Sequence, residues 1–326
     1  MKNILKTLVI LLLLFCFLFL IPSATHVGWA EIIDIPMDAE TKLTKVPDSI
    51  PYPQESGRIS DTEYSDPSIS VVLDTGRMYD TNYMTARVKI ANASQIRSMI
   101  SGNYNNSSEI MCDRLARRVN AVLAINGDYF SKRRNTGVMI RQGRVWYLPK
   151  NDRNLSYNGS IQYDILLIDK AGDLHILKSA VMADLEPYEP LADNIVNSFT
   201  FGPALVIDGV KQGDFPNTNN GPTKKTQRMA ICQTGPLEYL CICCEGPDDP
   251  GSTGMTMDEF ADLVASQEGV QQAYNLDGGA SSSMLFLGEK VNCPNRGARR
   301  ELVDILYFAS AYIPDSTSET TEPSAD

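Results

Sequence analysis

The sequence predicts an α+β domain with a mixed, largely antiparallel sheet and a few packed helices. Apolar or alternating runs are joined by turn signals into three hairpins, whereas two segments have the pattern of a capped helix. Hairpins therefore outnumber strand–helix alternations, and this balance favours a largely antiparallel sheet. The core, residues 69–313, is long enough for a single domain with one sizeable hydrophobic interior.

The N-terminus has the composition of an export signal. Lys2 and Lys6 precede an apolar run from Leu8 to Ile21, which matches the charged and apolar parts of a signal peptide. Counted from Ile4, the run approaches the length of a membrane span. Residues 1–30 are therefore predicted to be a signal peptide or an N-terminal membrane anchor, with the rest of the chain exported in either case.

Two acidic segments flank the core. Residues 31–68 contain five prolines and nine acids against three bases, and they are predicted to be a linker. Residues 314–326 are predicted to be a disordered acidic tail. Most of the net charge of −11 lies in these flanks, and −3 is left for the core. A near-neutral core argues against a nucleic-acid partner but permits a local basic site for one anionic group.

The first elements of the core are a strand, a helix and a second strand. Alternation over Tyr83–Ile90 predicts a strand. Asn106 to Glu109 has the pattern of a capping box that opens a helix through Val119. The short apolar strand that follows, 121–125, stops at Asn126-Gly127.

Three hairpins come next. They join Val138–Arg141 to Arg144–Tyr147, Tyr163–Ile168 to Leu174–Leu177, and Met229–Gln233 to Tyr239–Cys244. In the last part of the core, Thr256 to Glu259 is a second capping box, which predicts a helix from Met257 to Gln267. This helix leads into a strand at 272–276, and a further strand begins at Met284.

The histidine and cysteine content limits which catalytic groups, metal sites and disulfides the core can contain. His175 is the core's one histidine and lies in a predicted hairpin, so neither a Ser-His-Asp arrangement nor a multi-histidine metal site is expected. Acid–base work then falls to carboxylates. Six cysteines follow the leader, and an even number in an exported protein is compatible with disulfides. Cys241 to Cys244, however, lie in an apolar run typical of a buried strand, which favours free thiols.

The clearest candidate site is the loop after the strand 272–276. Asp277 opens a Gly-Gly loop there, where a carboxylate projects beyond the sheet and glycine allows a substrate close to the backbone. Ser281, Ser282 and the N–H groups of this loop are suited to holding phosphate oxygens. The same residues also fit a tight turn in which Asp277 caps its own backbone.

Three other positions carry weaker local signals. Asn126-Gly127 follows a strand and is primarily a turn signal. Arg228 either binds a phosphate or makes a surface ion pair. Glu245 ends the strand next to that of Arg228, so it either emerges near Arg228 or is a solvent-exposed hairpin carboxylate.

Taken in order, these segments resemble the phosphodiester glycosidase family. The resemblance covers residues 70–312, and its most specific part is Asn275–Ser282. The other segments are Ala124–Phe130, Phe201–Pro203, Arg228–Ile231, Glu245-Gly246 and Gly254 with its capped helix. The resemblance implies a phosphodiester glycosidase-like domain at 69–313. It would hydrolyse a sugar-1-phosphodiester of an N-acetylglucosamine-like sugar at the glycosidic bond, in envelope or exopolysaccharide metabolism.

The resemblance also marks individual residues. Those carried over are Asn126, Gly127, Arg228, Glu245, Asp277, Gly278, Gly279 and Ser281, with Arg300 before the final strand; Asp128 and Ser282 join the substrate-binding candidates. Three positions depart from the family pattern. Glu245 stands where relatives carry Asp, which extends its reach by about one C–C bond. Ala280 replaces a third glycine. Asp128 occupies a position that is often glycine, and it is either an added ligand or a turn residue.

The expected reaction assigns catalysis to Asp277, Glu245 and Arg228. Arg228, Ser281 and the backbone around Gly278-Gly279 would hold the phosphate as it gains charge. Asp277 and Glu245 would act as base or nucleophile, with a separation of about 5 Å indicating a nucleophile and about 6.5–9.5 Å a base with a water. No cofactor is required.

Two alternatives stay open. In a metal-dependent phosphodiesterase, Asp277, Asp128 and Glu245 would bind Mg²⁺ or Ca²⁺. In a non-catalytic envelope glycan-binding module, the same fold would bind its glycan without turnover. An uncleaved N-terminal segment would add contact with the membrane.

Overall fold

The computed structural model describes residues 30–37, 50–101, 110–128, 136–218, 220–292 and 301–315. The chain divides into two units. The first, Met1–Glu31 with Tyr312–Asp326, contains β24 (Tyr312–Ile313) and the start of β1 (Glu31–Ile32). The second unit, Ile32–Ala311, contains all the other elements described below. Within the described residues, no helix is long and apolar enough to cross a bilayer.

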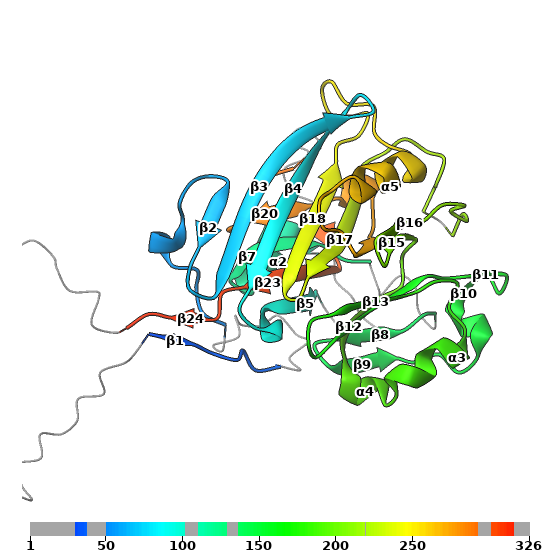
Figure 1. The fold of residues 1–326 in the computed structure, drawn as a ribbon, viewed down its shortest axis with the longest axis horizontal. Coiled ribbons are helices and arrows are strands. Elements are labelled where there is room, and N and C mark those ends of the chain that lie inside the picture. The colour runs from blue at the N-terminus through cyan, green and yellow to red at the C-terminus, as the bar shows by residue number, and fades with distance from the viewer. Residues whose placement is uncertain are drawn as a thin grey trace, which may run out of the picture. The chain divides into compact units, whose positions relative to one another are not determined.

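Two antiparallel sheets form the body of the second unit (Figure 1). The larger has eight strands, in the spatial order β16 (Val210–Lys211), β15 (Ala204–Ile207), β19 (Gln272–Asn275), β17 (Arg228–Gly235), β18 (Glu238–Cys244), β4 (Thr81–Ile90), β3 (Ile69–Met78) and β2 (Glu63–Ser65). The smaller has five, in the order β21 (Glu289–Lys290), β20 (Met284–Phe286), β7 (Ala121–Asn126), β23 (Asp304–Ala309) and β5 (Ile96–Ile100).

The main hydrophobic core lies between these two sheets. Val88 and Cys241 contribute to it from the larger sheet, and Ile125 and Phe308 from the smaller. Strands β7 and β23 are buried on both faces, which explains why their sequences are continuous apolar runs without alternation. The sheets therefore pack face to face, and the carboxyl end of β7 meets the larger sheet at one edge.

A helix covers the outer face of each sheet. Helix α5 (Met257–Ala265) lies beside β15 and β16 and packs its apolar side in one cluster with the outer face of the larger sheet (Figure 1). Helix α2 (Cys112–Arg118) packs on the smaller sheet through Leu115 and Ala116. The layers thus follow one another as helix, sheet, sheet and helix.

A smaller subassembly adds a fourth group of apolar contacts. It consists of the sheet β13 (Leu174–Leu177), β12 (Ile165–Asp169) and β14 (Ile195–Phe199), the hairpin β8 (Met139–Arg141) and β9 (Arg144–Tyr147), the pair β10 (Ser156–Tyr157) and β11 (Ile161–Gln162), and the short helices α3 (Met182–Leu185) and α4 (Leu191–Asn194). Strand β8 lies beside β14. This contact places Arg141 near the edge where β7 ends.

The α+β class and the three hairpins are confirmed. In the first hairpin, Gln142 and Gly143 both have positive φ, 51° and 70°, as a tight two-residue turn requires. The capping box of α5 is also confirmed: the Thr256 side chain accepts a hydrogen bond from the Glu259 N–H, and the Glu259 carboxylate accepts one from the Thr256 N–H.

Two predictions about local structure are wrong. The helix expected from the capping box at Asn106 begins only at Cys112, because Ile110–Met111 form strand β6, which pairs with β22 (Glu301–Leu302). The proposed cap itself lies outside the described residues. The linker expected through residue 68 is also incorrect for its last part. Tyr64 in β2 is fully buried against the main core, and Ile50 packs beside α2.

Candidate active site

Strand ends from both sheets meet at one edge of the second unit. The larger sheet contributes Asp277 after β19, Arg228 at the start of β17 and Glu245 after β18; the smaller contributes Asn126 at the end of β7 and Asp304 at the start of β23. Asn126 joins the two sheets, since its Nδ2 donates to the Asp277 carbonyl at 2.8 Å and its Oδ1 accepts from the Ser283 N–H at 3.0 Å. The Asp277 N–H donates to the Gly127 carbonyl at 3.2 Å. The predicted Asn-Gly and Asp-Gly-Gly segments are therefore brought together.

The glycine loop is a tight turn packed against Gln227. A Cβ on Gly278 would lie 2.8 Å from the Gln227 carbonyl, and Gly279 has φ +58° while its N–H donates to that carbonyl at 2.9 Å. Asp277 Oδ1 accepts from the Gly278 N–H at 2.8 Å, so Asp277 does cap its own backbone. Asp277 as a whole is nonetheless only half-buried.

The N–H groups of this loop are not directed outward. Besides those of Gly278 and Gly279, the Ser281 N–H donates to the Gly278 carbonyl at 3.1 Å and the Ser282 N–H to the Gly279 carbonyl at 3.2 Å. Ser281 is partly exposed, whereas Ser282 is 2% exposed and its hydroxyl has no hydrogen-bond partner among the described residues. Of the predicted phosphate ligands in the loop, Ser281 is thus the accessible one.

Glu245 lines a cavity of about 460 Å³ next to this loop. Its Oε2 accepts hydrogen bonds from Asn82 Nδ2 at 3.0 Å and Ser252 Oγ at 2.6 Å. Arg77 and Asn292 also line the cavity, and Asn292 Nδ2 donates to the carbonyl of Ser282 at 3.1 Å, which connects the cavity to the glycine loop. This volume lies within the usual range for small-molecule sites, about 300–1,000 Å³.

Arg228 is placed differently from the prediction. It is 2% exposed, and its guanidinium donates to four backbone carbonyls: Met255 at 3.2 Å and Asn220, Gly221 and Lys224 at 2.7 Å each. Desolvation by burial lowers the pKa of Arg228 to about 10. Because these donors bond the backbone, Arg228 fixes the segment 220–224 in this structure rather than presenting a free guanidinium to a phosphate.

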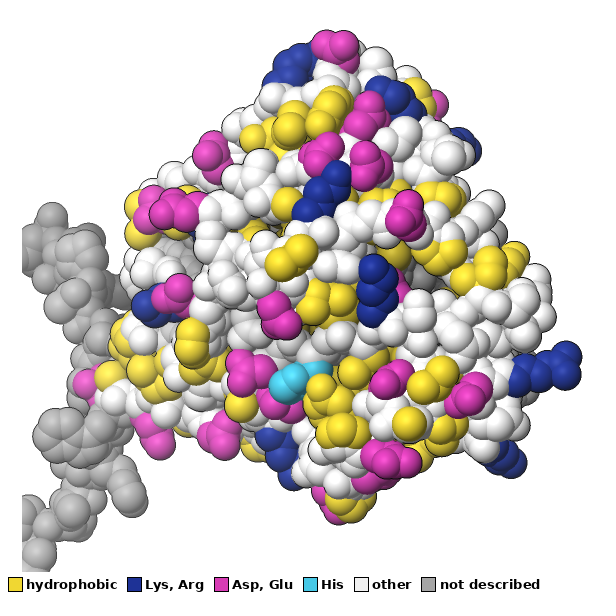
Figure 2. Space-filling view, turned by 45° about the vertical axis from the view of Figure 1, so that its right-hand side comes forward, with side chains coloured by type: hydrophobic (Ala, Val, Ile, Leu, Met, Phe, Trp, Pro, Cys, Tyr) yellow, Lys and Arg dark blue, Asp and Glu magenta, His cyan; other side chains and the backbone are white. Residues whose placement is uncertain are grey.

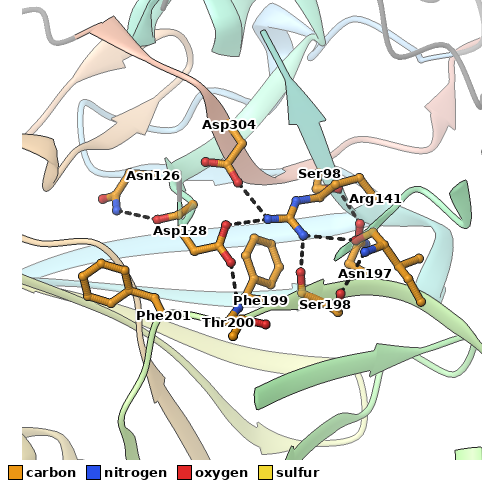
Figure 3. Close-up of polar contacts among 12 residues, drawn as sticks. Ser98, Asn126, Asp128, Arg141, Asn197, Ser198, Phe199, Thr200, Phe201 and Asp304 are labelled. Atoms are coloured by element: carbon orange, nitrogen blue, oxygen red, sulfur yellow. Dashed lines mark hydrogen bonds and ion pairs between the residues drawn. The ribbon is translucent and has the colours of Figure 1, made fainter. Parts of the chain in front are cut away.

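Asp128 belongs to a buried charge network that sequence reasoning did not predict (Figure 3). Arg141 Nη2 donates to Asp128 Oδ1 at 2.7 Å and to Asp304 Oδ2 at 2.9 Å, and all three side chains are at most 3% exposed. Burial, together with the neighbouring charge of Asp128, raises the pKa of Asp304 to about 7, although Arg141 opposes the shift. Asp128 is therefore neither an exposed turn residue nor a ligand on the surface.

The network had one partial signal in the sequence. Asp128 departs from the family pattern, but Arg141 and Asp304 lie in ordinary apolar strands, and Asp304 is distant from it along the chain. Only packing of β8 and β23 beside the end of β7 brings the three together. Arg77, Asn82 and Asn292 were missed for the same reason.

The remaining predicted residues can be placed briefly. Arg300 and Cys293 lie outside the described residues. The five described core cysteines are buried free thiols, as the apolar run predicted. His175 Nε2 lies 2.8 Å from Asp169 Oδ2 on the protein surface, which agrees with its structural interpretation. In the part of the chain that the structure describes, no group of three or more His, Cys, Asp or Glu side chains is arranged to hold a metal ion.

The surface carries charges of both signs. On the face shown in Figure 2, acidic, basic and apolar side chains are interspersed. This matches a core whose net charge is close to zero.

The fold and the site together define an α+β domain of two packed antiparallel sheets, with a carboxylate-bearing glycine loop at their common edge. The chain belongs to the phosphodiester glycosidase family, whose sequence model matches residues 119–309. A comparison with curated proteins gave no significant match.

Solved structures are similar to this chain at low sequence identity, and one of them shows the same fold. The catalytic domain of zebrafish N-acetylglucosamine-1-phosphodiester α-N-acetylglucosaminidase, auto-inhibited by its pro-peptide, is similar with a TM-score of 0.53 and 15% identity, over 80% of this chain and 87% of that one. A hypothetical protein from Synechocystis (TM-score 0.46, 15% identity, 76% of this chain and 64% of that one) and a putative exported protein from Burkholderia pseudomallei (TM-score 0.45, 14%, 70% and 74%) are further matches.

Proposed function

We propose that this protein is an exported hydrolase that cleaves the glycosidic bond of a sugar-1-phosphodiester. The sugar is N-acetylglucosamine-like, and the setting is envelope or exopolysaccharide metabolism. Family membership supports the reaction class. The observation that carries the proposal is the placement of two carboxylates, Asp277 and Glu245, at one edge of the larger sheet, where Glu245 lines a cavity of sugar size.

Asp277 is the proposed base. The residue is half-buried, and its carboxylate is oriented by the Gly278 N–H. It would remove a proton from a water that attacks the anomeric carbon. The new bond forms between this water oxygen and the anomeric carbon, while the bond from that carbon to the phosphate oxygen breaks. The bonding electrons leave with the phosphomonoester, which is a good leaving group and needs no strong general acid.

Glu245 is proposed to stabilise the sugar as positive charge develops on the anomeric carbon. Two hydrogen bonds from Asn82 and Ser252 hold its Oε2 within the cavity. A fixed carboxylate near a developing cation stabilises the transition state more than the ground state.

Arg77 replaces Arg228 as the proposed phosphate ligand. It lines the same cavity as Glu245, and its side chain is 50% exposed. Its Nη1 donates to Asn82 Oδ1 at 2.9 Å and to the Gly251 carbonyl at 2.8 Å, which hold the guanidinium in place. Ser281 would add a hydroxyl donor.

The test uses a simple N-acetylglucosamine-1-phosphodiester in ¹⁸O-labelled water, with wild type and Asp277→Asn compared in the presence and absence of a chelator. We expect label in the released sugar, chelator-resistant turnover and at least a 10³-fold loss in the variant, of the order typical for a removed catalytic group. Label in the phosphate with chelator sensitivity would instead support the Mg²⁺- or Ca²⁺-dependent phosphodiesterase. Saturable glycan binding without turnover would support the binding module.

Export and membrane contact are tested separately. Fractionation of cells that produce the full chain should place it outside the cytoplasm, and the mass of the recovered protein would show whether residues 1–30 are removed. Retention of these residues would leave the chain attached to the outer face of the membrane.

A further inference from the structure

The strand end that presents Asp277 is held by loops on both sides. On one side, the Gly127 carbonyl accepts from the Asp277 N–H at 3.2 Å, and Asn126 Nδ2 donates to the Asp277 carbonyl at 2.8 Å. On the other side, the Gly202 carbonyl accepts from Asn275 Nδ2 at 2.7 Å. The direction of the Asp277 side chain therefore depends on the positions of both loops.

Asp128 connects these two loops. It directly follows Gly127, and its Oδ2 accepts from the Thr200 N–H at 2.7 Å, two residues before Gly202 (Figure 3). Its Oδ1 accepts from Arg141 Nη2 at 2.7 Å. Both oxygens are thus occupied by donors from different elements, and burial protects these bonds from competition by water.

Arg141 and Asp304 complete the connection. The Arg141 guanidinium lies over the Phe199 ring, 4.2 Å from its centroid, and Nη1 donates to the Ser198 carbonyl, so it is anchored on β14. Asp304 accepts from Arg141 and fills the space beside Gly127, where an added Cβ would lie 2.5 Å from the Asp304 Cγ. Gly127 is therefore confined by the network on one face while its carbonyl bonds Asp277.

We propose that Asp128, Arg141 and Asp304 form a positioning unit that holds residues 126–128 and 200–203 on either side of residues 274–277 and so fixes the direction of the Asp277 carboxylate. The catalytic consequence rests on the proposed function. The effect on the Asp277 segment does not, because it is a property of the folded chain alone.

The first variant is Asp128→Ala. It removes the hydrogen bonds that Asp128 accepts from Thr200 and Arg141. Arg141 stays paired with Asp304, so the buried charges remain balanced. We expect hydrogen exchange of the amides in 275–279 to accelerate relative to wild type. With the sugar-1-phosphodiester, kcat should fall about 10- to 100-fold while KM stays nearly constant, since small errors of position cost rate rather than affinity.

The matched control is Asp113→Asn. Asp113 is another buried acid, 3.4 Å from Arg117 on α2, and lies on the outer side of the smaller sheet. This control should lower stability without changing kcat or the exchange of 275–279. It separates a general loss of stability from a local effect on Asp277.

A second variant, Asp128→Asn, serves if the alanine variant does not fold. Asparagine must turn its NH₂ toward either Arg141 or the Thr200 N–H, so one connection is replaced by two opposed donors. The proposed positioning role would be overturned if a folded Asp128 variant showed unchanged hydrogen exchange at 275–279. It would also be overturned if exchange became faster while kcat stayed at the wild-type value. Failure of the wild type to cleave any sugar-1-phosphodiester counts against the proposed function, and the exchange result then decides the positioning of Asp277 on its own.

Discussion

At the residue scale, Arg228 and Asp277 differ in how much of each side chain a ligand can reach. Both were assigned to the site from the family resemblance, and both stand at ends of neighbouring strands. Asp277 is half-buried, whereas Arg228 is buried among backbone carbonyls. The sequence could identify the residue type at each position, but the surrounding carbonyls come from segments 220–224 and 255, and only the folded chain brings them there.

The position of Arg228 leads to a prediction about stability. Arg228→Lys should lower the free energy of unfolding by about 2–4 kcal/mol, because one ammonium cannot reach carbonyls placed around a planar guanidinium and leaves some of them without a donor. Urea denaturation measures this change. Arg87→Lys, at an exposed position of β4, is the control and should change stability by less than about 0.5 kcal/mol. If the two variants lowered the free energy of unfolding equally, the hydrogen bonds from Arg228 to the backbone carbonyls would not be the source of the stability.

Asp304 leads to a prediction about pH. Its pKa of about 7 lies above the unfolded value near 4, so the folded state binds the proton more tightly between these pH values. This tighter proton binding contributes to the free energy of unfolding at low pH, and the contribution is lost as the pH rises toward 7. Asp304→Asn should therefore gain stability relative to wild type as the pH is raised from 4 to 7. Denaturation curves at several pH values test this, and a constant difference would contradict the assignment.

At the element scale, the most accurate predictions concern segments whose signal is local. The hairpins and α5 were recognised because turn residues and the capping box act within a few positions. The helix expected from Asn106 failed because Ile110–Met111 pair with β22, nearly 200 residues away along the chain. A capping pattern carries no information about a distant strand such as β22, which competes with the helix for Ile110 and Met111.

The strand order predicts the stereochemistry of the proposed reaction. Strand β17 lies between β19, which carries Asp277, and β18, which carries Glu245, so the two chain positions are about 10 Å apart. Glu245 bonds Asn82 on β4 and thus leans away from Asp277. This spacing is well above the roughly 5 Å at which a carboxylate attacks directly and leaves room for a water, so we expect inversion at the anomeric carbon. Proton NMR of the first-formed sugar measures it; net retention would indicate that a carboxylate attacks directly.

At the scale of the whole molecule, residues 50–65 lie at the end of the second unit opposite the site. Asn120, which precedes β7, donates to the Ile50 carbonyl at 2.8 Å, whereas the site lies after the other end of β7. Tyr64 pairs with Val71 in the first part of β3, whereas Arg77, near its far end, lines the cavity with Glu245. This segment stabilises the core and does not cover the cavity.

Removal of the N-terminal segment tests this arrangement. A chain that begins at residue 69 should have a lower melting temperature than one that begins at residue 30, because Tyr64 and Ile50 no longer cover apolar surface. Its kcat per folded molecule should not rise. An increase in kcat with unchanged stability would instead indicate an inhibitory segment, as in the zebrafish catalytic domain that is auto-inhibited by its pro-peptide.

The sequence by itself determined the α+β class, the three hairpins, helix α5, and the two segments, Asn126-Gly127 and Asp277-Gly278-Gly279, that meet at the site. These features depend on apolar periodicity and turn chemistry within short stretches. The tertiary structure alone decided that the strands form two packed sheets, that Arg228 bonds the backbone, and that Asp128, Arg141 and Asp304 share one buried network. The physical reason is that burial and pairing of charged side chains depend on which distant segments pack together, and local sequence does not contain that information.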